Sequence, residues 1–376
     1  MPERGFINAN IQPEKSNPKQ KVARIFARPQ KQIVAEAKIP ILEIIKEEIK
    51  VADETNDSAK NNKKKRLADQ EKKEIEGIFD DLKVLEEIYL EAEKVIGEDK
   101  TDYEKFFRTG IRIEHDVKND LKYIKRIENN IFSDEQSKKS AIMEAVVTLG
   151  AKKLNWFGNL VEMDAASRLD NITGTDILLK IKLSEEKYDF LFGGIDITIR
   201  NPQKKFFSIK AVKLLEKIKK GSLGIIAYYQ DKRGKCFPEL KVPMIIIAFD
   251  EETVKELAYL FKDMNDPEKE NRLINHRAKQ VVINQILGEC DLLSGYAERC
   301  GQKTMVIAYK NLKNAILQTA RRSPELKDLV AYYTPDVPSR TLDVLKTLIE
   351  KQEKGLNGDI LEMIKEKKSR NKNNAN

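Results

Sequence analysis

The spacing of apolar and polar residues changes several times along the chain. From 75 to 96, apolar residues recur at alternating steps of three and four; they are Ile75, Ile78, Leu82, Leu85, Tyr89, Ala92 and Ile96. This spacing is typical of the a/d seam of a coiled coil. A second amphipathic stretch carries Phe107, Ile113, Val117, Leu121, Ile124, Ile127 and Ile131. We predict an antiparallel helical hairpin over 71–135, whose second helix covers the seam. Homodimerisation, or a protein partner bound through the same seam, is the alternative.

The part of the chain after 137 has a different pattern, in which short apolar runs alternate with amphipathic stretches. In chain order we predict a helix, three strands, a helix and two strands, at 137–154, 159–167, 175–183, 188–200, 208–220, 223–230 and 242–250. Three consecutive strands suggest an antiparallel meander, and the later helix suggests a crossover into a parallel neighbour. The last strand is so uniformly apolar that we expect both of its faces to be buried. The predicted fold class is therefore α/β, with a mixed sheet in the order αβββαβ.

The two ends of the chain differ from this central region. Residues 1–70 are poor in aromatic residues and end near the run KNNKKKR at 60–66, so we predict a flexible basic arm. Within it, 33–51 is apolar enough for a short helix or a docking strand. Beyond 251 the pattern is mostly helical, and 311–376 reads as C-terminal helices with a polar tail. The run MVIAY at 305–309 fits either a strand or part of a long helix.

Composition narrows the classes of protein that remain. No apolar run approaches the length of about 18 residues that a membrane helix needs, and the first residues lack the apolar core of a secretory signal. The three cysteines are scattered without metal-ligand spacing, which indicates reduced thiols in a cytoplasmic protein. With only two histidines, any bound metal should be a hard cation held by carboxylates.

The positive charge is concentrated in one window. The chain carries a net charge of +8, yet 200–241 alone holds twelve Lys or Arg residues against three acids, a net +9. A concentrated positive field suits a polyanion such as DNA or RNA. From this window we expect the nucleic-acid contacts to come from Arg200, Lys204, Lys205, Lys217, Lys220, Lys232 and Arg233. A solvated helix face beside a basic hairpin loop is the alternative interpretation.

Acidic residues occupy unusual places in the predicted α/β region. Glu144 lies inside a helix, and Asp170 and Asp176 bracket the turn DNITGTD. Asp196 lies between two isoleucines in the third strand, so its side chain points away from the face that they occupy. A buried carboxylate costs several kcal/mol without a compensating charge, so we expect a metal ion or a lysine beside Asp196. Asp170 is equally well explained as the residue that forms the turn.

The order of these elements and acids resembles the PD-(D/E)XK nuclease superfamily. More narrowly, ASRLDNITGTD followed by GIDIT and KLLEKIKKG resembles a bacterial branch of it, over roughly 140–310. The resemblance implies a restriction-endonuclease-like core, at 137–310, that hydrolyses phosphodiesters in nucleic acid. It also implies that Asp176 and Asp196 hold Mg²⁺ or Mn²⁺ and that Glu144 assists as a third ligand.

The sequence departs from the superfamily at its lysine. Where acid-x-Lys is usual, this chain has Asp196, Ile197 and Thr198. Members of the superfamily can supply the lysine from the following helix, where Lys210 and Lys213 are the candidates. A non-catalytic nucleic-acid-binding or scaffold protein that retains the fold is the competing hypothesis. Tyr228 and Tyr229 fit either base stacking or the core.

Overall fold

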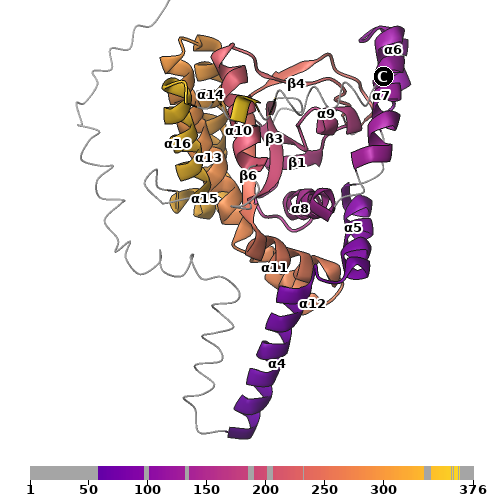
Figure 1. The fold of residues 1–376 in the computed structure, drawn as a ribbon, viewed down its shortest axis with the longest axis vertical. Coiled ribbons are helices and arrows are strands. Elements are labelled where there is room, and N and C mark those ends of the chain that lie inside the picture. Colours follow the sequence, from indigo (N-terminus) through magenta and orange to yellow (C-terminus); the bar gives the residue numbers. More distant parts are fainter. Residues whose placement is uncertain are drawn as a thin grey trace, which may run out of the picture. The chain divides into compact units, whose positions relative to one another are not determined.

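The structure is a computed structural model that describes 58–96, 101–131, 135–184, 190–200, 206–231, 233–333, 340–356 and parts of 358–364. The chain divides into the units Met1–Ile39 and Pro40–Asn376, and every described residue belongs to the second. This described part is a mixed α/β fold, mostly helical, with a four-stranded and a two-stranded sheet (Figure 1). The predicted helix or docking strand at 33–51 lies outside the described residues.

The larger sheet confirms the predicted meander and crossover. Strands β1 (Val161–Ala165), β2 (Ile177–Lys182) and β3 (Phe190–Arg200) pair antiparallel in that order. Helix α10 (Phe206–Lys219) follows β3, and β6 (Met244–Asp250) then pairs with β3 in parallel. An antiparallel neighbour can be reached by a short turn, whereas a parallel neighbour requires a crossover.

The strand predicted at 223–230 does not join this sheet. Only Gly224–Ile226 is a strand, β4, and it pairs with β5 (Leu240–Val242) in a separate two-stranded sheet. Gly224 packs so tightly on Met244 that an added Cβ would collide with that side chain. β4 thus lies against β6 without sharing its hydrogen-bond ladder. The apolar sequence of this strand does not show whether it joins the larger sheet or only packs on it.

Strand β6 is the edge of the larger sheet, and side chains from two helices satisfy its outer backbone groups. Gln285, on α13 (Ala278–Arg299), accepts from the N–H of Ala248 and donates to its carbonyl, each at 2.8 Å. The carboxyl group of Glu289, one turn further, accepts from the N–H of Ile246 at 2.9 Å. The Tyr309 hydroxyl, on α14 (Lys303–Ala320), donates to the carbonyl of Met244 at 3.0 Å. The edge is therefore closed, and β6 is buried on both faces as its sequence predicted.

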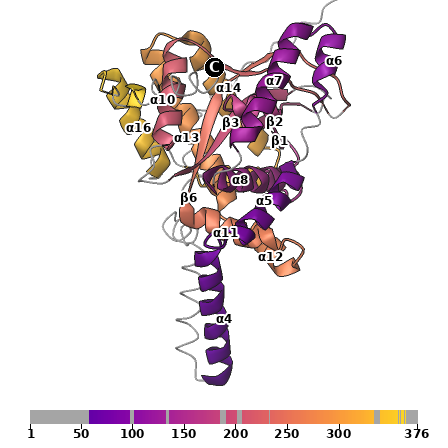
Figure 2. The ribbon, with the colours of Figure 1, turned by 45° about the vertical axis from the view of Figure 1, so that its right-hand side comes forward.

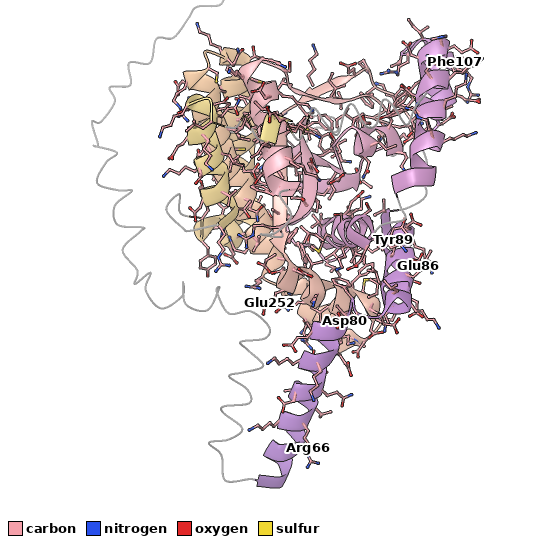
Figure 3. The ribbon with its side chains drawn as sticks, viewed as in Figure 1. Arg66, Asp80, Glu86, Tyr89, Phe107 and Glu252 are labelled. Carbon is pink, nitrogen blue, oxygen red and sulfur yellow. The ribbon has the colours of Figure 1, made fainter. Side chains whose placement is uncertain are left out.

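The helices predicted as a hairpin pack against different neighbours. α5 (Leu82–Ile96) packs along α8 (Glu135–Lys152), and Lys138 of α8 forms an ion pair with Glu86 of α5. α7 (Glu114–Ile131) instead packs with α6 (Tyr103–Arg108) and α9 (Arg168–Ile172). Figure 3 shows Tyr89 on the side of α5 that meets α8, where the tyrosine is buried. The central helix of the α/β core, α8, therefore covers the seam in place of α7.

Residue 82 marks where the predicted seam is interrupted. The chain turns after α4 (Ser58–Gly77), so Leu82 is 69% exposed while Leu85 is buried. α4 begins inside the segment predicted to be a flexible arm, and its first half extends away from α11 (Glu251–Lys262), as Figures 1 and 2 show. Lysine and arginine, which make up most of the run at 60–66, favour helix, as do the alanines and glutamates elsewhere in α4.

The region after β6 is helical, as predicted. Beyond α11 come α12 (Pro267–Ile274), α13, α14, α15 (Pro324–Ala331) and α16 (Arg340–Glu353). The run MVIAY is part of α14. The polar tail from 365 lies outside the described residues. Within the described part, no helix is both long and apolar enough to cross a membrane.

Candidate active site

Two aspartates meet where β2 and β3 run side by side. The pair Ile177 and Ile195 is in register, so Asp176, one residue earlier, lies opposite Asp196. The backbone N–H of Asp176 donates to the carbonyl of Ile195 at 2.8 Å. Its carboxylate Oδ2 accepts from the N–H of Ile197 at 2.6 Å. The turn that leads into β2 is closed by Gly174 at φ +101°, which a side chain would strain.

The ammonium of Lys210 reaches this pair from α10. Its Nζ donates to Asp196 Oδ1 and, at 2.8 Å, to the carbonyl of Ile197. Thr198, at the position where acid-x-Lys would place a lysine, is buried. Lys213, one turn further along α10, lies on the exposed side of the helix. Of the two candidate lysines, the structure brings only Lys210 to the aspartates.

The third carboxylate comes from α8. Glu144 is only 6% exposed, and its Oε2 accepts from the side-chain amide of Asn171 on α9 at 3.1 Å. The charges of Asp176, Arg168 and Lys210 all act on Glu144, so it belongs to the same electrostatic cluster. Asn171 and Arg168 were not among the predicted site residues. Its position in the DNITGTD turn, between two candidate acids, is the feature of the sequence that could have identified Asn171.

The pKa values of the ionisable groups in this cluster are shifted by burial and by the charges of their neighbours. Burial, then the charge of Asp196, raises the pKa of Asp176 to about 7, and a hydrogen bond between the two carboxyl groups acts in the same direction. Burial and the charge of Asp176 hold the pKa of Glu144 well above its usual range. Burial lowers the pKa of Lys210, but Asp196 and Asp176 outweigh it, so that pKa lies above its ordinary value. These raised pKa values favour the protonated forms of Glu144 and Asp176, so Lys210 alone does not keep all three acids ionised.

Asp170, the other acid of the turn, has a structural role. It is 1% exposed, and its two carboxylate oxygens accept from the N–H groups of Ala227 at 2.8 Å and Tyr228 at 3.2 Å. The hydroxyl of Ser167 also donates to it, at 2.7 Å. Asp170 thus ties α9 to the chain after β4. Tyr228 is buried there against Tyr103, so it cannot stack on a base.

The predicted nucleic-acid contacts are placed unevenly. Lys217 and Lys220 are exposed, as is Arg233 at the tip of the β4–β5 arm. Arg200 is half-buried at the end of β3, where it lies opposite Asp250. Lys204, Lys205 and Lys232 lie outside the described residues. The described basic side chains of the window that a polyanion can reach therefore lie on the exposed side of α10, directly after its end, and in the β4–β5 arm.

The donor set fits a hard divalent cation in its chemistry, because every candidate ligand is a carboxylate oxygen. A divalent cation would also supply the additional positive charge that favours the ionised forms of Glu144 and Asp176. As the side chains stand, no group of three or more Asp, Glu, His or Cys residues in the described part is arranged to hold a metal ion. The Lys210 ammonium bonds to Oδ1 of Asp196, so it would compete with an ion for that oxygen.

Comparison with models of protein families, with curated proteins and with solved structures found no match to this chain.

Proposed function

We propose that the protein is a divalent-metal-dependent hydrolase of phosphodiesters in nucleic acid, built on a PD-(D/E)XK-type core. One observation carries the proposal: α8, β2, β3 and α10 bring Glu144, Asp176, Asp196 and Lys210 into one electrostatic cluster. The sheet order β1-β2-β3-β6 with its parallel crossover supports the type of core. The net +9 window, whose exposed lysines include those of α10, supports a polyanionic substrate.

Each side chain has a distinct role in this proposal. Asp176 and Asp196 would hold Mg²⁺ or Mn²⁺, with Glu144 as the further ligand that Asn171 orients. The ion, when bound, supplies positive charge to the phosphate and activates water. Lys210, released from Asp196, donates to a phosphate oxygen and stabilises the negative charge that develops there. Without the ion, burial raises the pKa of Asp176 to about 7, so binding of the ion near neutral pH would displace a proton from this carboxyl group.

A non-catalytic nucleic-acid-binding or scaffold protein is the second candidate. The observation that favours it is the bond between Lys210 and Asp196, which gives the aspartate a structural partner. In that case the ion pair compensates the buried carboxylate without a metal ion. The basic surface of α10 would bind nucleic acid, and no phosphodiester would be cut.

Hydrolysis of labelled single-stranded DNA, duplex DNA and RNA with Mg²⁺ or Mn²⁺ tests the proposal, with Asp196→Asn as the diagnostic variant. We expect that variant to lose at least roughly a hundredfold in rate, since changing even a residue behind a metal ligand costs ten- to a hundredfold. Mg²⁺ or Mn²⁺ should raise the melting temperature of the wild type and not that of Asp196→Asn. Asp343→Asn, an exposed change on α16, is the control. A wild type that neither cuts nor responds to either metal contradicts the proposal.

A further inference from the structure

Four partly exposed aromatic rings form a continuous group on the larger sheet and the arm above it. Phe190 and Phe192 come from β3, and Tyr229 and Phe237 come from the two sides of the β4–β5 arm. The ring centroids lie 6.4 Å apart from Phe190 to Phe192, 5.3 Å from Phe192 to Tyr229 and 5.2 Å from Tyr229 to Phe237. We call these four rings the aromatic platform. Unlike Tyr228, none of them is buried.

The aromatic platform lies on the same face of β3 as the candidate site. Phe190, Phe192, Gly194 and Asp196 are alternate residues of one strand, so they share a face. Phe192 and Asp196 are four residues apart, roughly 13 Å along a strand. Gly194 lies between them, and the side chain of Met244 fills the space that its missing Cβ leaves. The platform and Asp196 therefore lie on the same face of the sheet, with the Met244 side chain beside Gly194 between them.

The surroundings of the platform suit a ligand that has both rings and negative charge. Lys180, which lies opposite Phe192 in β2, is neutralised by Glu162 at 2.7 Å and by Asp164. The exposed Lys235 places its Nζ 5.1 Å from the centroid of the Phe237 ring. Because Lys180 is neutralised, the aromatic platform itself is uncharged, and Lys235 adds a positive charge at its edge. Such a surface favours a ligand that places a flat ring over the aromatic rings and an anion near Lys235. Nucleobases and phosphates supply these two groups in alternation.

We infer that the aromatic platform stacks the unpaired bases of a single-stranded nucleic acid and leads the strand toward Asp196. This inference rests on the proposed function, and it specifies the substrate class as single-stranded rather than duplex. Bases inside a duplex already stack on each other, so their faces cannot reach aromatic side chains. Lys235 binds phosphate beside the rings, and the exposed lysines of α10 bind it further along.

The test measures metal-free binding of a single-stranded oligonucleotide that carries one 2-aminopurine, in EDTA. Stacking of this fluorescent base on an aromatic ring quenches its emission. We expect Phe237→Leu to weaken binding roughly five- to a hundredfold and to reduce the quenching, because each stacked base contributes through its ring. Phe237→Tyr keeps a ring and should bind like the wild type, which separates lost stacking from lost folding. Tyr332→Leu, an exposed aromatic change directly after α15, is the control.

Two results would overturn the inference: wild-type affinity and quenching in Phe237→Leu, or wild-type protein that binds single strands no more tightly than a duplex of equal length. The same oligonucleotide incubated with Mg²⁺ or Mn²⁺ separates this inference from the proposed function. Quenched binding without cleavage supports the platform and contradicts hydrolysis. Cleavage that is unchanged in Phe237→Leu supports hydrolysis and contradicts the platform.

Discussion

At the scale of single residues, Lys210 determines the charge of the candidate site. Its ammonium is the group that bonds to Asp196, and it also acts on Asp176 and Glu144. The side chain of Lys210 is 33% exposed and that of Asp196 is 13% exposed, so water screens the pair only in part. The lysine therefore both compensates buried carboxylates and competes with any cation that binds them.

Lys210→Met should separate these two effects. Without metal, the variant should be less stable by about 2 kcal/mol, because the carboxylates lose their counter-charge while the pair is not fully buried. Mg²⁺ or Mn²⁺ should raise its melting temperature more than that of the wild type, because no ammonium competes for Asp196. Hydrolysis should be lost. Thermal melts with and without metal, and the cleavage assay, measure these three quantities.

Lys213→Met is the matched control, since Lys213 lies on the same helix with its side chain exposed. It should leave the metal-free melting temperature and the metal response close to those of the wild type. A metal response in Lys210→Met that is equal to or smaller than the wild type's would count against a cation site on Asp196.

At the scale of secondary-structure elements, α13 covers the edge strand β6 of the larger sheet. An edge strand exposes unpaired N–H and C=O groups, which invite pairing with another chain. Here Gln285 and Glu289 bond to those groups from one turn to the next of α13. Glutamine imitates a peptide group and needs no charge. Glu289 is fully buried, and burial raises its pKa to about 8.

Glu289→Gln should change how stability depends on pH. The unfolded chain releases the proton of Glu289 near pH 4.3, whereas the folded protein keeps it up to about pH 8. The folded state thus binds more protons in this window, and the stability of the wild type falls as pH rises through it. Glutamine accepts the same bond from Ile246 and cannot ionise. The variant should match the wild type near pH 4.5 and exceed it by several kcal/mol at pH 8.

Urea unfolding at a series of pH values measures this difference. Glu298→Gln, an exposed change on the same helix, should follow the wild-type pH dependence. Parallel pH curves for Glu289→Gln and the wild type would mean that Glu289 is not kept protonated in the folded protein.

At the scale of the whole molecule, charge is arranged around one helix. The chain has a net +8, and the window 200–241 that contains α10 has +9. α10 directs Lys210 to the aspartates and exposes Lys213 and Lys217, and Lys220 is exposed directly after its end. A polyanion bound along the exposed side therefore passes beside the candidate site. Because such binding releases counterions, its affinity should fall steeply with salt.

Neutralising Lys213, Lys217 and Lys220 together, each to Gln, should weaken nucleic-acid binding at low salt. The slope of log affinity against log salt should become shallower by about two to three, one for each phosphate contact removed. Titrations of single-stranded DNA at several salt concentrations give the slope. The scattered exposed triple Lys262, Lys310 and Lys327, changed in the same way, keeps the net charge equal and should leave the slope unchanged. Equal slopes for both triples would place the contact elsewhere.

The sequence by itself determined the elements of the α/β region and much of their order. Period-two alternation and turn residues depend on neighbours in the chain, so β1, β2 and β3 were predictable as a meander, and β6 as a buried strand after a crossover. Because the meander places β2 beside β3, the neighbouring positions of Asp176 and Asp196 also followed from the sequence. The lysine from the following helix was predictable only as one of two.

Tertiary structure decided which surfaces meet and which groups lose water. The apolar seam of α5 requires an apolar partner surface, and both α7 and α8 carry apolar residues. The tertiary packing, rather than the spacing of apolar residues in the sequence, decided that α8 covers the seam. β4 and β6 are both apolar, yet only β6 joined the larger sheet. The contact of Asn171 with Glu144, the contact of Lys210 rather than Lys213 with Asp196, and the burial that raises the pKa of Glu289 were likewise decided by the fold. These features depend on desolvation and on distances between residues far apart in the chain, which local patterns do not encode.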